Sequence, residues 1–294
     1  MATEEETLND ETMKELTGET DDEYNVHCNL PINNIICSEA SKLLKTFPNN
    51  CIDLVVTSPP YDNLRDYKGY SFDFKSIVKQ LFRVIKEGGV VVWVVADATI
   101  DGSETGTSFK QALHFKEIGF NLYDTMIYRR LGMRFPESSR YYPCFEFMFV
   151  LSKGKPKTIN LIKDRKNITV GQKLARKSQD RNKDGELKPN SAYRLDKNRR
   201  ILSYGVRWNI WEYHTGGVGK SYKEPFVSKH PAVFPEKLAE DHIKSWSNEE
   251  DIVLDPMCGS GTTCKMAKIN NRYFIGIDIS EEYLKIATER LQNV

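Results

Sequence analysis

The feature that most constrains the fold is a series of short apolar segments, rich in Val and Ile, that alternate with amphipathic ones. Four of them are nearly uninterrupted apolar runs, as expected for parallel β-strands buried on both faces of a sheet. Strands are predicted at residues 33–38, 52–58, 90–95, 121–130, 145–153, 251–257 and 273–280. No helical pattern separates residues 121–130 from 145–153, so these two strands are predicted to form an antiparallel pair.

Helical patterns lie between most of the predicted strands. They cover residues 72–89, 106–120, 234–247 and 281–294. The first two end at glycine, a residue that often terminates a helix. This alternation of strands and helices predicts an α/β fold with a doubly wound sheet.

Charge is distributed unevenly along the 294 residues, although the formal net charge is only +1. Residues 1–24 carry ten acidic residues and one Lys, and are predicted to be a disordered, solvated tail. Residues 153–207 carry seventeen Lys and Arg against five acidic residues. They belong to a segment, residues 154–229, that breaks the strand–helix rhythm and is predicted to be an irregular insert. A polyanionic partner is therefore compatible with the nearly neutral total.

Cysteine usage and hydropathy exclude several kinds of protein. The six Cys residues form no Cys-x-x-Cys pair, so they are predicted to be reduced thiols of a cytoplasmic protein without a metal site. No segment approaches the roughly 20 apolar residues of a membrane span, and the acidic N-terminus is unlike a signal peptide. Residues 216–221, Gly-Gly-Val-Gly-Lys-Ser, resemble a phosphate loop. However, His214 occupies the first required glycine position, and no strand and helix are predicted around the loop.

The second predicted strand ends in a Ser-Pro-Pro-Tyr sequence, which consists of Ser58, Pro59, Pro60 and Tyr61. Proline lacks a backbone donor and fixes φ, so the carbonyl groups beside it leave the sheet ladder and can accept hydrogen bonds elsewhere. Taken alone, this sequence is also typical of an ordinary strand-to-loop turn.

A glycine-rich turn follows the strand at 251–257. Its residues are Asp255, Pro256, Gly259, Ser260, Gly261, Thr262 and Thr263. Glycines allow the backbone to approach a ligand closely at a helix N-terminus. Asp278 ends the next strand, at the position where a carboxylate can bind both hydroxyls of a ribose. The two features fit an adenosine-containing cofactor, and the lack of Lys after the glycines argues against ATP.

In their order along the chain, these motifs resemble those of the amino-methylating DNA methyltransferases of restriction–modification type. Residues 230–243 are similar to the segment that precedes the glycine-rich motif in those enzymes. The resemblance covers about residues 33–294 and implies a seven-stranded, mostly parallel S-adenosylmethionine-dependent methyltransferase fold. It implies a catalytic half at 25–153, a target-recognition insert at 154–229 and a cofactor-binding half at 230–294.

The resemblance also implies a cofactor, S-adenosylmethionine, and a substrate, double-stranded DNA. The glycine-rich motif would face the methionine part of the cofactor and Asp278 its ribose, while Phe234 and Pro235 would border the sulfonium. Ser38 and Glu39 replace the Gly-Asp that is usual in the family, which leaves a cofactor contact from that strand end open.

On the substrate side, Ser58 and the Pro59 carbonyl would accept hydrogen bonds from the exocyclic amine of a flipped base, and Tyr61 would stack on that base. Arg199 and Arg200, at the densest end of the basic run, are candidates for phosphate contacts. Cytosine N4 is favoured over adenine N6 as the target, because Ser before Pro-Pro-Tyr is in this family more often linked with cytosine.

Several alternatives stay open. A catalytically silent, S-adenosylmethionine-binding DNA module is the alternative from another class, and methylation of RNA or of a protein glutamine are further enzyme alternatives. Pro143-Cys144 would suit a covalent mechanism, but a packed strand cysteine is favoured. Trp208 and Trp211 are predicted to be core residues that anchor the insert, and Asp97 is either a pocket residue or a turn carboxylate. The expected location is cytoplasmic, at the nucleoid. A cognate restriction endonuclease and the choice between monomer and homodimer are not decided.

Overall fold

The computed structural model of the chain describes residues 30–60, 72–132, 139–173, 179–189, 200–215, 219–230 and 232–294. It divides into two compact units. The larger consists of Met1–Asn160 with Asn209–Val294, and the smaller of Leu161–Trp208. The acidic segment 1–24 lies outside the described residues. None of the helices in the described ranges is long and apolar enough to cross a membrane.

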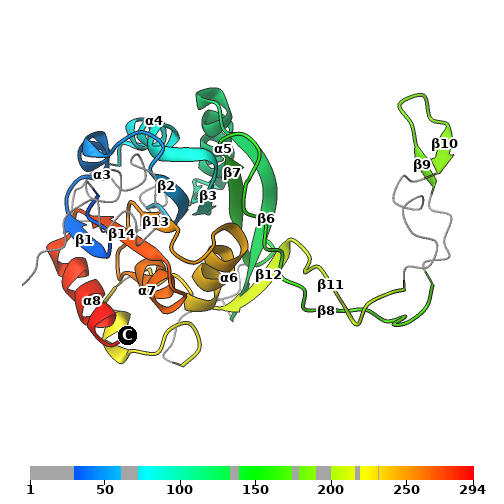
Figure 1. Cartoon of the computed structure of the whole chain (residues 1–294). Helices are drawn as coiled ribbons and strands as arrows, with labels where there is room; N and C mark the ends of the chain where they lie inside the picture. The colour runs from blue at the N-terminus through cyan, green and yellow to red at the C-terminus, as the bar shows by residue number, and fades with distance from the viewer. Residues whose placement is uncertain are drawn as a thin grey trace, which may run out of the picture. The chain divides into compact units, whose positions relative to one another are not determined.

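An eight-stranded sheet forms the centre of the larger unit (Figure 1), in the order β1-β14-β13-β2-β3-β7-β6-β12. The strands are β1 (Asn34–Cys37), β2 (Ile52–Thr57), β3 (Ile85–Val95), β6 (Asn121–Leu131), β7 (Phe145–Ser152), β12 (Ile210–His214), β13 (Ile252–Asp255) and β14 (Tyr273–Asp278). Neighbours are parallel except at β7, which is antiparallel to β3 and β6. The predicted fold class and the antiparallel pair are confirmed.

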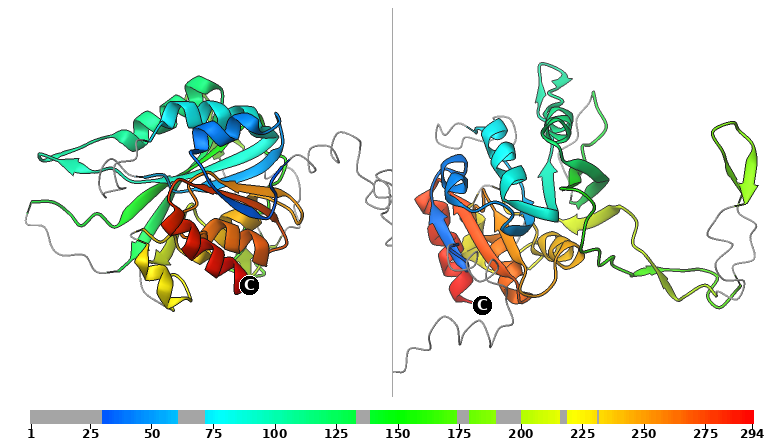
Figure 2. Two further views of the ribbon diagram at one scale, coloured as in Figure 1. Left: turned by 90° about the vertical axis from the view of Figure 1, so that its left-hand side faces the viewer. Right: turned by 45° about the horizontal axis from the view of Figure 1, so that its top comes forward.

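Helices cover both faces of this sheet, as the left view of Figure 2 shows. One face carries α3 (Ala40–Leu43), η1 (Leu44–Thr46), α4 (Phe74–Val84) and α5 (Thr107–Ile118), and the other carries α6 (Glu236–Trp246), α7 (Thr262–Ile269) and α8 (Glu281–Gln292). A short hairpin of β4 (Thr99–Ile100) and β5 (Ser103–Glu104) lies between β3 and α5, and η3 (Pro225–Lys229) precedes α6. The Ser280 hydroxyl caps α8 by accepting a hydrogen bond from Tyr283 N.

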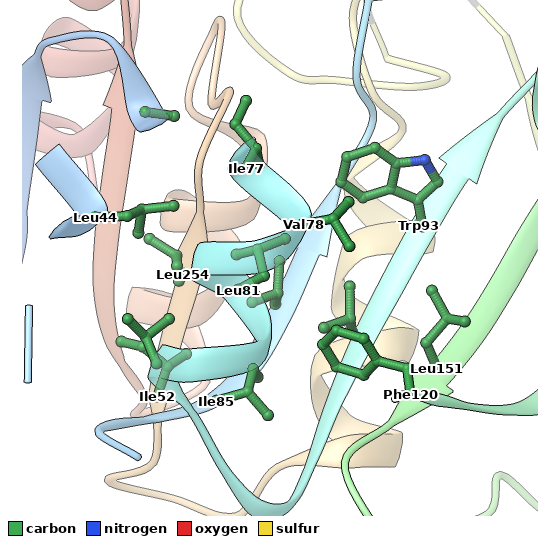
Figure 3. Packing of buried hydrophobic residues seen from close by; sticks show 14 of the residues in the cluster. Leu44, Ile52, Ile77, Val78, Leu81, Ile85, Trp93, Phe120, Leu151 and Leu254 are labelled. Atoms are coloured by element: carbon green, nitrogen blue, oxygen red, sulfur yellow. The ribbon is translucent and has the colours of Figure 1, made fainter. Parts of the chain in front are cut away.

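The main hydrophobic core lies between the sheet and the layer of α4 and α5 (Figure 3). Its members include Leu44, Ile52, Ile77, Val78, Leu81, Ile85, Trp93, Phe120, Leu151 and Leu254. Trp93 is fully buried, packs edge-on against Phe115 with ring centroids 5.1 Å apart, and donates its indole N–H to Gln111 Oε1 at 2.8 Å. This packing holds β2 and β3 rigidly, and so fixes where the chain leaves the sheet after Thr57.

The predicted helix at 72–89 is too long. It ends at Val84, and Ile85 to Gly89 begin β3 instead. Ile85 pairs with Ile52, Val90 pairs with Leu54, and the register shifts between these pairs. Gly88 has a φ of 82° within this irregular stretch, so the glycine pair allows a bulge in the strand and does not cap the helix. Pairing with β2 has overridden the local helical pattern.

The sheet also has an eighth strand that the sequence analysis assigned to the insert. Strand β12 pairs in parallel with β6, and its burial alternates so that Trp211 and Tyr213 face the core. A strand with apolar side chains on one face only has no continuous apolar run, and such runs were the signal from which the other strands were predicted. Trp211 is buried as predicted. The prediction for Trp208 is wrong, because its side chain is 67% exposed and lies 4.4 Å from the Arg165 guanidinium.

The smaller unit contains two short antiparallel ladders in its described part. One pairs β8 (Arg165–Lys166) with β11 (Tyr204–Gly205), and the other pairs β9 (Gln179–Arg181) with β10 (Leu187–Pro189). Apolar side chains such as Ile168 and Leu202 are exposed here. The predicted insert 154–229 is therefore longer than the compact unit, because its last part supplies β12 and η3 to the larger unit.

Candidate active site

The two motifs singled out from the sequence meet at one edge of the sheet. Strands β14, β13 and β2 are adjacent and parallel, so Asp278, Asp255 and Ser58 reach the carboxyl edge together. The carboxyl edge of a parallel sheet is where α/β proteins bind their ligands. Residues far apart in the sequence therefore form one candidate site.

A buried hydrogen bond joins the motifs directly, between two residues that are 198 positions apart. Thr57 Oγ1 donates to Asp255 Oδ1 at 2.7 Å, and Met257 N donates to the same oxygen at 3.1 Å. Thr263 Oγ1, in α7, donates to the Val56 carbonyl at 3.1 Å. Both ends of the glycine-rich turn are thus attached to the last residues of β2, immediately before Ser58.

Asp255 is an unusually buried carboxyl group, with 5% of its surface exposed. Burial raises its pKa to about 6, although the hydrogen bonds from Thr57 and Met257 N act in the opposite direction. The motif in the sequence predicts a cofactor contact for Asp255. In the structure its Oδ1 accepts the hydrogen bond from Thr57, so this side chain joins β13 to β2.

The glycine-rich loop, defined here as residues 258–262, has a backbone that requires glycine at two positions. Gly259 and Gly261 have φ values of 49° and 73°, in the left-handed region. A Cβ atom on Gly261 would lie 2.8 Å from the Ala287 Cβ of α8. The loop leads directly into α7, and the first N–H groups of a helix have no partners within it. Gly259 N and Gly261 N already donate to Asp278 Oδ2 and to the Cys258 carbonyl, so the donors that could meet a ligand are those at the start of α7.

Asp278 holds this loop in place. Its Oδ2 accepts a hydrogen bond from Gly259 N at 2.8 Å, and its Oδ1 accepts one from Ser280 N at 2.9 Å. Burial raises the pKa of Asp278, and the two backbone donors oppose that rise. Each carboxylate oxygen can accept a second hydrogen bond, so Asp278 retains the capacity to bind a pair of hydroxyl groups.

The segment before α6 brings in a residue that the sequence analysis did not single out. The His230 ring packs against Tyr283 with centroids 4.4 Å apart, and a Cβ atom on Gly259 would lie 2.6 Å from His230 Nε2. His230 therefore adjoins the glycine-rich loop. One indication of His230 was present in the sequence, which is that it opens the segment 230–243 that resembles the family. Phe234 is half-buried, and Pro235 is the N-cap residue of α6.

The described part of the Ser-Pro-Pro-Tyr sequence, Ser58 to Pro60, follows the end of β2. Pro59 is buried, while Ser58 and Pro60 are half-buried. Tyr61 lies outside the described residues, as does Arg199. Arg200 belongs to the smaller unit, where its guanidinium is exposed and donates to the Gly171 carbonyl at 2.9 Å.

Three further predictions concern residues near this edge. Cys144 is exposed and immediately precedes β7, so the prediction of a packed strand cysteine is wrong. Because β7 is the antiparallel strand, its first residues lie at the carboxyl edge of the neighbouring strands.

Asp97 accepts hydrogen bonds from Ser108 N and Oγ at 2.8 and 2.5 Å, so it is a turn carboxylate that binds the first turn of α5. Glu39 pairs with Lys42 at 2.7 Å, within the first turn of α3.

Within the described ranges, no group of three His, Cys, Asp or Glu side chains could hold a metal ion. The phosphate-loop interpretation of 216–221 is also not supported by its described neighbours. The chain after Ser221 forms the 3-10 helix η3, and the Ser221 hydroxyl donates to the His214 carbonyl at 2.6 Å.

Comparison with known proteins gives a consistent answer. The family described as DNA methylase matches residues 52–289. The orphan methyltransferase M.BamHII of Bacillus amyloliquefaciens is 58% identical over 242 residues, which cover 82% of this chain and 89% of the relative. The solved structure of PvuII DNA methyltransferase (cytosine-N4-specific) has a TM-score of 0.61 at 20% identity, covering 87% of this chain and 85% of that one. A complex of M1.HpyAVI with S-adenosylmethionine has a TM-score of 0.55 at 22% identity, covering 88% and 98%.

The family match begins at β2 and ends in α8, so it includes the Ser-Pro-Pro-Tyr sequence, the smaller unit and the glycine-rich loop. The resemblance inferred from the motifs is thereby confirmed. The chain belongs to the N6/N4 DNA methylases, the amino-methyltransferases of restriction–modification type that use S-adenosylmethionine.

Proposed function

We propose that the protein is a site-specific methyltransferase that acts on N4 of a flipped cytosine in double-stranded DNA. The observation that carries this proposal is the hydrogen bond between Thr57 and Asp255, because it links Ser58 to the loop that would hold the cofactor. A base presented to Ser58 would therefore lie beside the methyl donor. Positioning of this kind accounts for much of the rate enhancement in group transfer.

The residues at the carboxyl edge fit S-adenosylmethionine, which supplies an electrophilic methyl group on a sulfonium. In loop 258–262 the missing Cβ atoms of Gly259 and Gly261 let His230 and Ala287 approach the backbone, and the N–H groups at the start of α7 would face the cofactor. Asp278 would accept hydrogen bonds from the two ribose hydroxyls with its remaining lone pairs. Asp255, Pro256 and the backbone of Gly259, Ser260 and Gly261 would face the methionine part, and Thr262 and Thr263 begin α7. Phe234 and Pro235 would border the sulfonium.

The catalytic residues act on the amine of the base. The lone pair of an exocyclic amine is delocalised into the ring, so the amine is a poor nucleophile. Ser58 Oγ and the Pro59 carbonyl would accept hydrogen bonds from its two hydrogens, which favours a pyramidal nitrogen and stabilises the positive charge that develops on it. Pro60 keeps the chain out of the sheet ladder. Tyr61 would stack on the base and offset part of the few kcal/mol that flipping costs.

The choice of cytosine rests on Ser58, since Ser in this position of the motif is in the family more often linked with cytosine. Mass spectrometry of nucleosides from DNA treated with the pure protein tests the choice. N4-methylcytosine is the expected product. N6-methyladenine would assign the enzyme to the runner-up substrate, and unmodified DNA in the presence of bound cofactor would indicate a catalytically silent module.

Replacing Asp278 by alanine is expected to weaken S-adenosylmethionine binding by about 1–3 kcal/mol, because the ribose hydroxyls lose a charged acceptor and the loop loses its anchor. Isothermal titration calorimetry measures the effect. Asp251→Ala is the matched control, since it removes a carboxylate that also accepts a backbone N–H, from Asn248 at 2.7 Å, but lies just before β13, at the opposite edge of the sheet. Equal affinities for wild type and a folded Asp278→Ala variant would remove Asp278 from the cofactor site.

For target recognition, we propose that the insert 154–229 binds DNA through its basic side chains. Each phosphate contact is expected to contribute about 0.9 log units of affinity per tenfold change in salt. Neutralising Arg199 and Arg200 together should weaken DNA binding and flatten this slope, while cofactor affinity stays unchanged. Lys75 and Lys79, two exposed residues of α4, provide a control that removes the same charge elsewhere. If the slopes of wild type and the arginine variant coincide, this part of the insert does not contact phosphates.

A further inference from the structure

Four charged side chains lie together beside the glycine-rich loop, which one of them, Arg290, contacts directly. Lys265 comes from α7 and Arg290 from α8, while Glu224 and Glu236 flank the segment before α6. The two cations are almost completely buried, with exposed fractions of 3% for Lys265 and 0% for Arg290. We call this group the four-charge cluster.

Each cation of the cluster contacts both carboxylates. Lys265 Nζ pairs with Glu224 and, at 2.6 Å, with Glu236. The Arg290 guanidinium pairs with Glu224 at 3.2 Å and with Glu236 at 2.7 Å. Burial is the largest single influence on Glu224 and opposes its ionisation. The hydrogen bond from Lys265, a backbone hydrogen bond and the charges of Arg290 and Lys265 together outweigh it and hold the pKa of this carboxyl group below its usual range. The cluster is therefore a closed ring of two positive and two negative charges.

Arg290 extends this ring to the glycine-rich loop. Its Nη1 donates to the Ser260 carbonyl at 3.1 Å and to Thr262 Oγ1 at 2.7 Å, and also lies 3.4 Å from Ser260 Oγ. Ser260 stands between the two glycines with left-handed φ values. The guanidinium consequently fixes the loop at the point where its backbone has most freedom.

The carboxylates of the cluster fix a second element against the same loop. Glu224 and Glu236 stand at the two ends of the segment 224–236, which carries His230 and Phe234-Pro235. Within it, Val227 packs against Ile286 of α8 in a small hydrophobic cluster. The segment is thus attached at both ends to α7 and α8, and the His230 ring lies against Gly259 between these attachments.

Stability alone does not explain such an arrangement. Buried ion pairs pay a desolvation cost that often equals their attraction, and apolar replacements of similar volume are frequently as stable. The ring instead fixes the relative positions of its neighbours, because the planar guanidinium donates in set directions to two carboxylates and to the loop at once.

From these contacts we infer that Arg290 is a positioning residue for cofactor binding. Through the four-charge cluster it holds loop 258–262 and segment 224–236 in the relative placement that the cofactor requires. The inference rests on the assignment of this loop to S-adenosylmethionine. Loss of the guanidinium should weaken cofactor affinity and leave the transfer step at saturating cofactor nearly unchanged.

The test compares Arg290→Lys with Arg272→Lys. Lysine retains the positive charge but cannot donate to both carboxylates and to the loop. Arg272 is the matched control, because it also donates to backbone carbonyls, those of Asn270 and Ser247, but at the opposite edge of the sheet. Calorimetry with S-adenosylhomocysteine should show affinity reduced by about tenfold or more in Arg290→Lys, as expected for the loss of hydrogen bonds to a charged group, and unchanged in Arg272→Lys. The kcat at saturating S-adenosylmethionine should stay within about threefold.

A folded Arg290→Lys variant with wild-type affinity, or equal losses of affinity in both variants, would overturn the inference. So would a fall in kcat with unchanged affinity. If Arg290→Lys does not fold, Glu224→Gln decides, since it removes one charge of the ring and keeps a similar shape. It should weaken S-adenosylhomocysteine binding in the same direction, and unchanged affinity would again overturn the inference. Failure of the wild-type protein to bind S-adenosylhomocysteine would instead contradict the assignment of the loop.

Discussion

Replacing Ser58 by alanine is expected to lower kcat by about 10²–10³-fold, the range seen when one preorganised group that stabilises developing charge is removed. Affinity for S-adenosylmethionine should stay within about threefold, because the links between β2 and the glycine-rich loop are made by Thr57 and Val56. Tyr61→Ala should likewise reduce transfer and spare cofactor binding. Single-turnover methyl transfer and calorimetry on the same preparations separate the two quantities.

Cys144→Ser is the control for this mechanism, and the exposed position of Cys144 beside the carboxyl edge makes it a stringent one. Activity within a few-fold of wild type is expected, because methylation of an exocyclic amine needs no covalent enzyme intermediate. An inactive Cys144 variant, or a trapped covalent adduct with DNA, would contradict the noncovalent mechanism. Weakened cofactor binding in Ser58→Ala would assign Ser58 to the cofactor site.

The buried carboxyl group of Asp255 should make the stability of the protein depend on pH. Its pKa is about 6 in the folded chain and about 4 in an unfolded one, so the folded state binds the extra proton between these values. The free energy of unfolding should consequently rise as pH falls through this window, and fall as pH rises. A shift of about two units corresponds to roughly 3 kcal/mol.

Asp255→Asn isolates this effect, since asparagine keeps an oxygen that can accept the hydrogen bonds from Thr57 and Met257 N but does not titrate. Urea unfolding of both proteins without cofactor, from about pH 7 to about pH 4, gives the difference in free energy of unfolding. Wild type should gain roughly 3 kcal/mol relative to the variant over that range. A difference that does not change with pH would mean that Asp255 titrates normally.

The sequence was informative wherever one local rule dominated. Continuous apolar runs identified the strands that are buried on both faces, and Gly119 marked the end of α5 because its φ of 120° is open to glycine. The two motifs could be recognised in the sequence for a similar reason. Two prolines after a strand, or two glycines before a helix, impose backbone geometry whatever the rest of the chain does.

Features that depend on distant partners could not be predicted in the same way. The residues before Ile85 have a helical pattern in the sequence, but Ile85 is a strand residue because it pairs with Ile52. Strand β12 is recognisable only once β6 provides its partner. The charges of Glu224 and Arg290, 66 residues apart, look like ordinary surface charges until α8 packs beside the glycine-rich loop. Each of these outcomes is decided by tertiary contact.

The order of the strands has a consequence for how this enzyme comes into being. Strands β14 and β13, from the last part of the chain, lie between β1 and β2, which come from its beginning. As the polypeptide leaves the ribosome, the edge of β2 has no neighbour on that side until β13 has been synthesised. The hydroxyl of Thr57 has no Asp255 to bind before then. A product truncated before β13 would therefore lack one side of the candidate site.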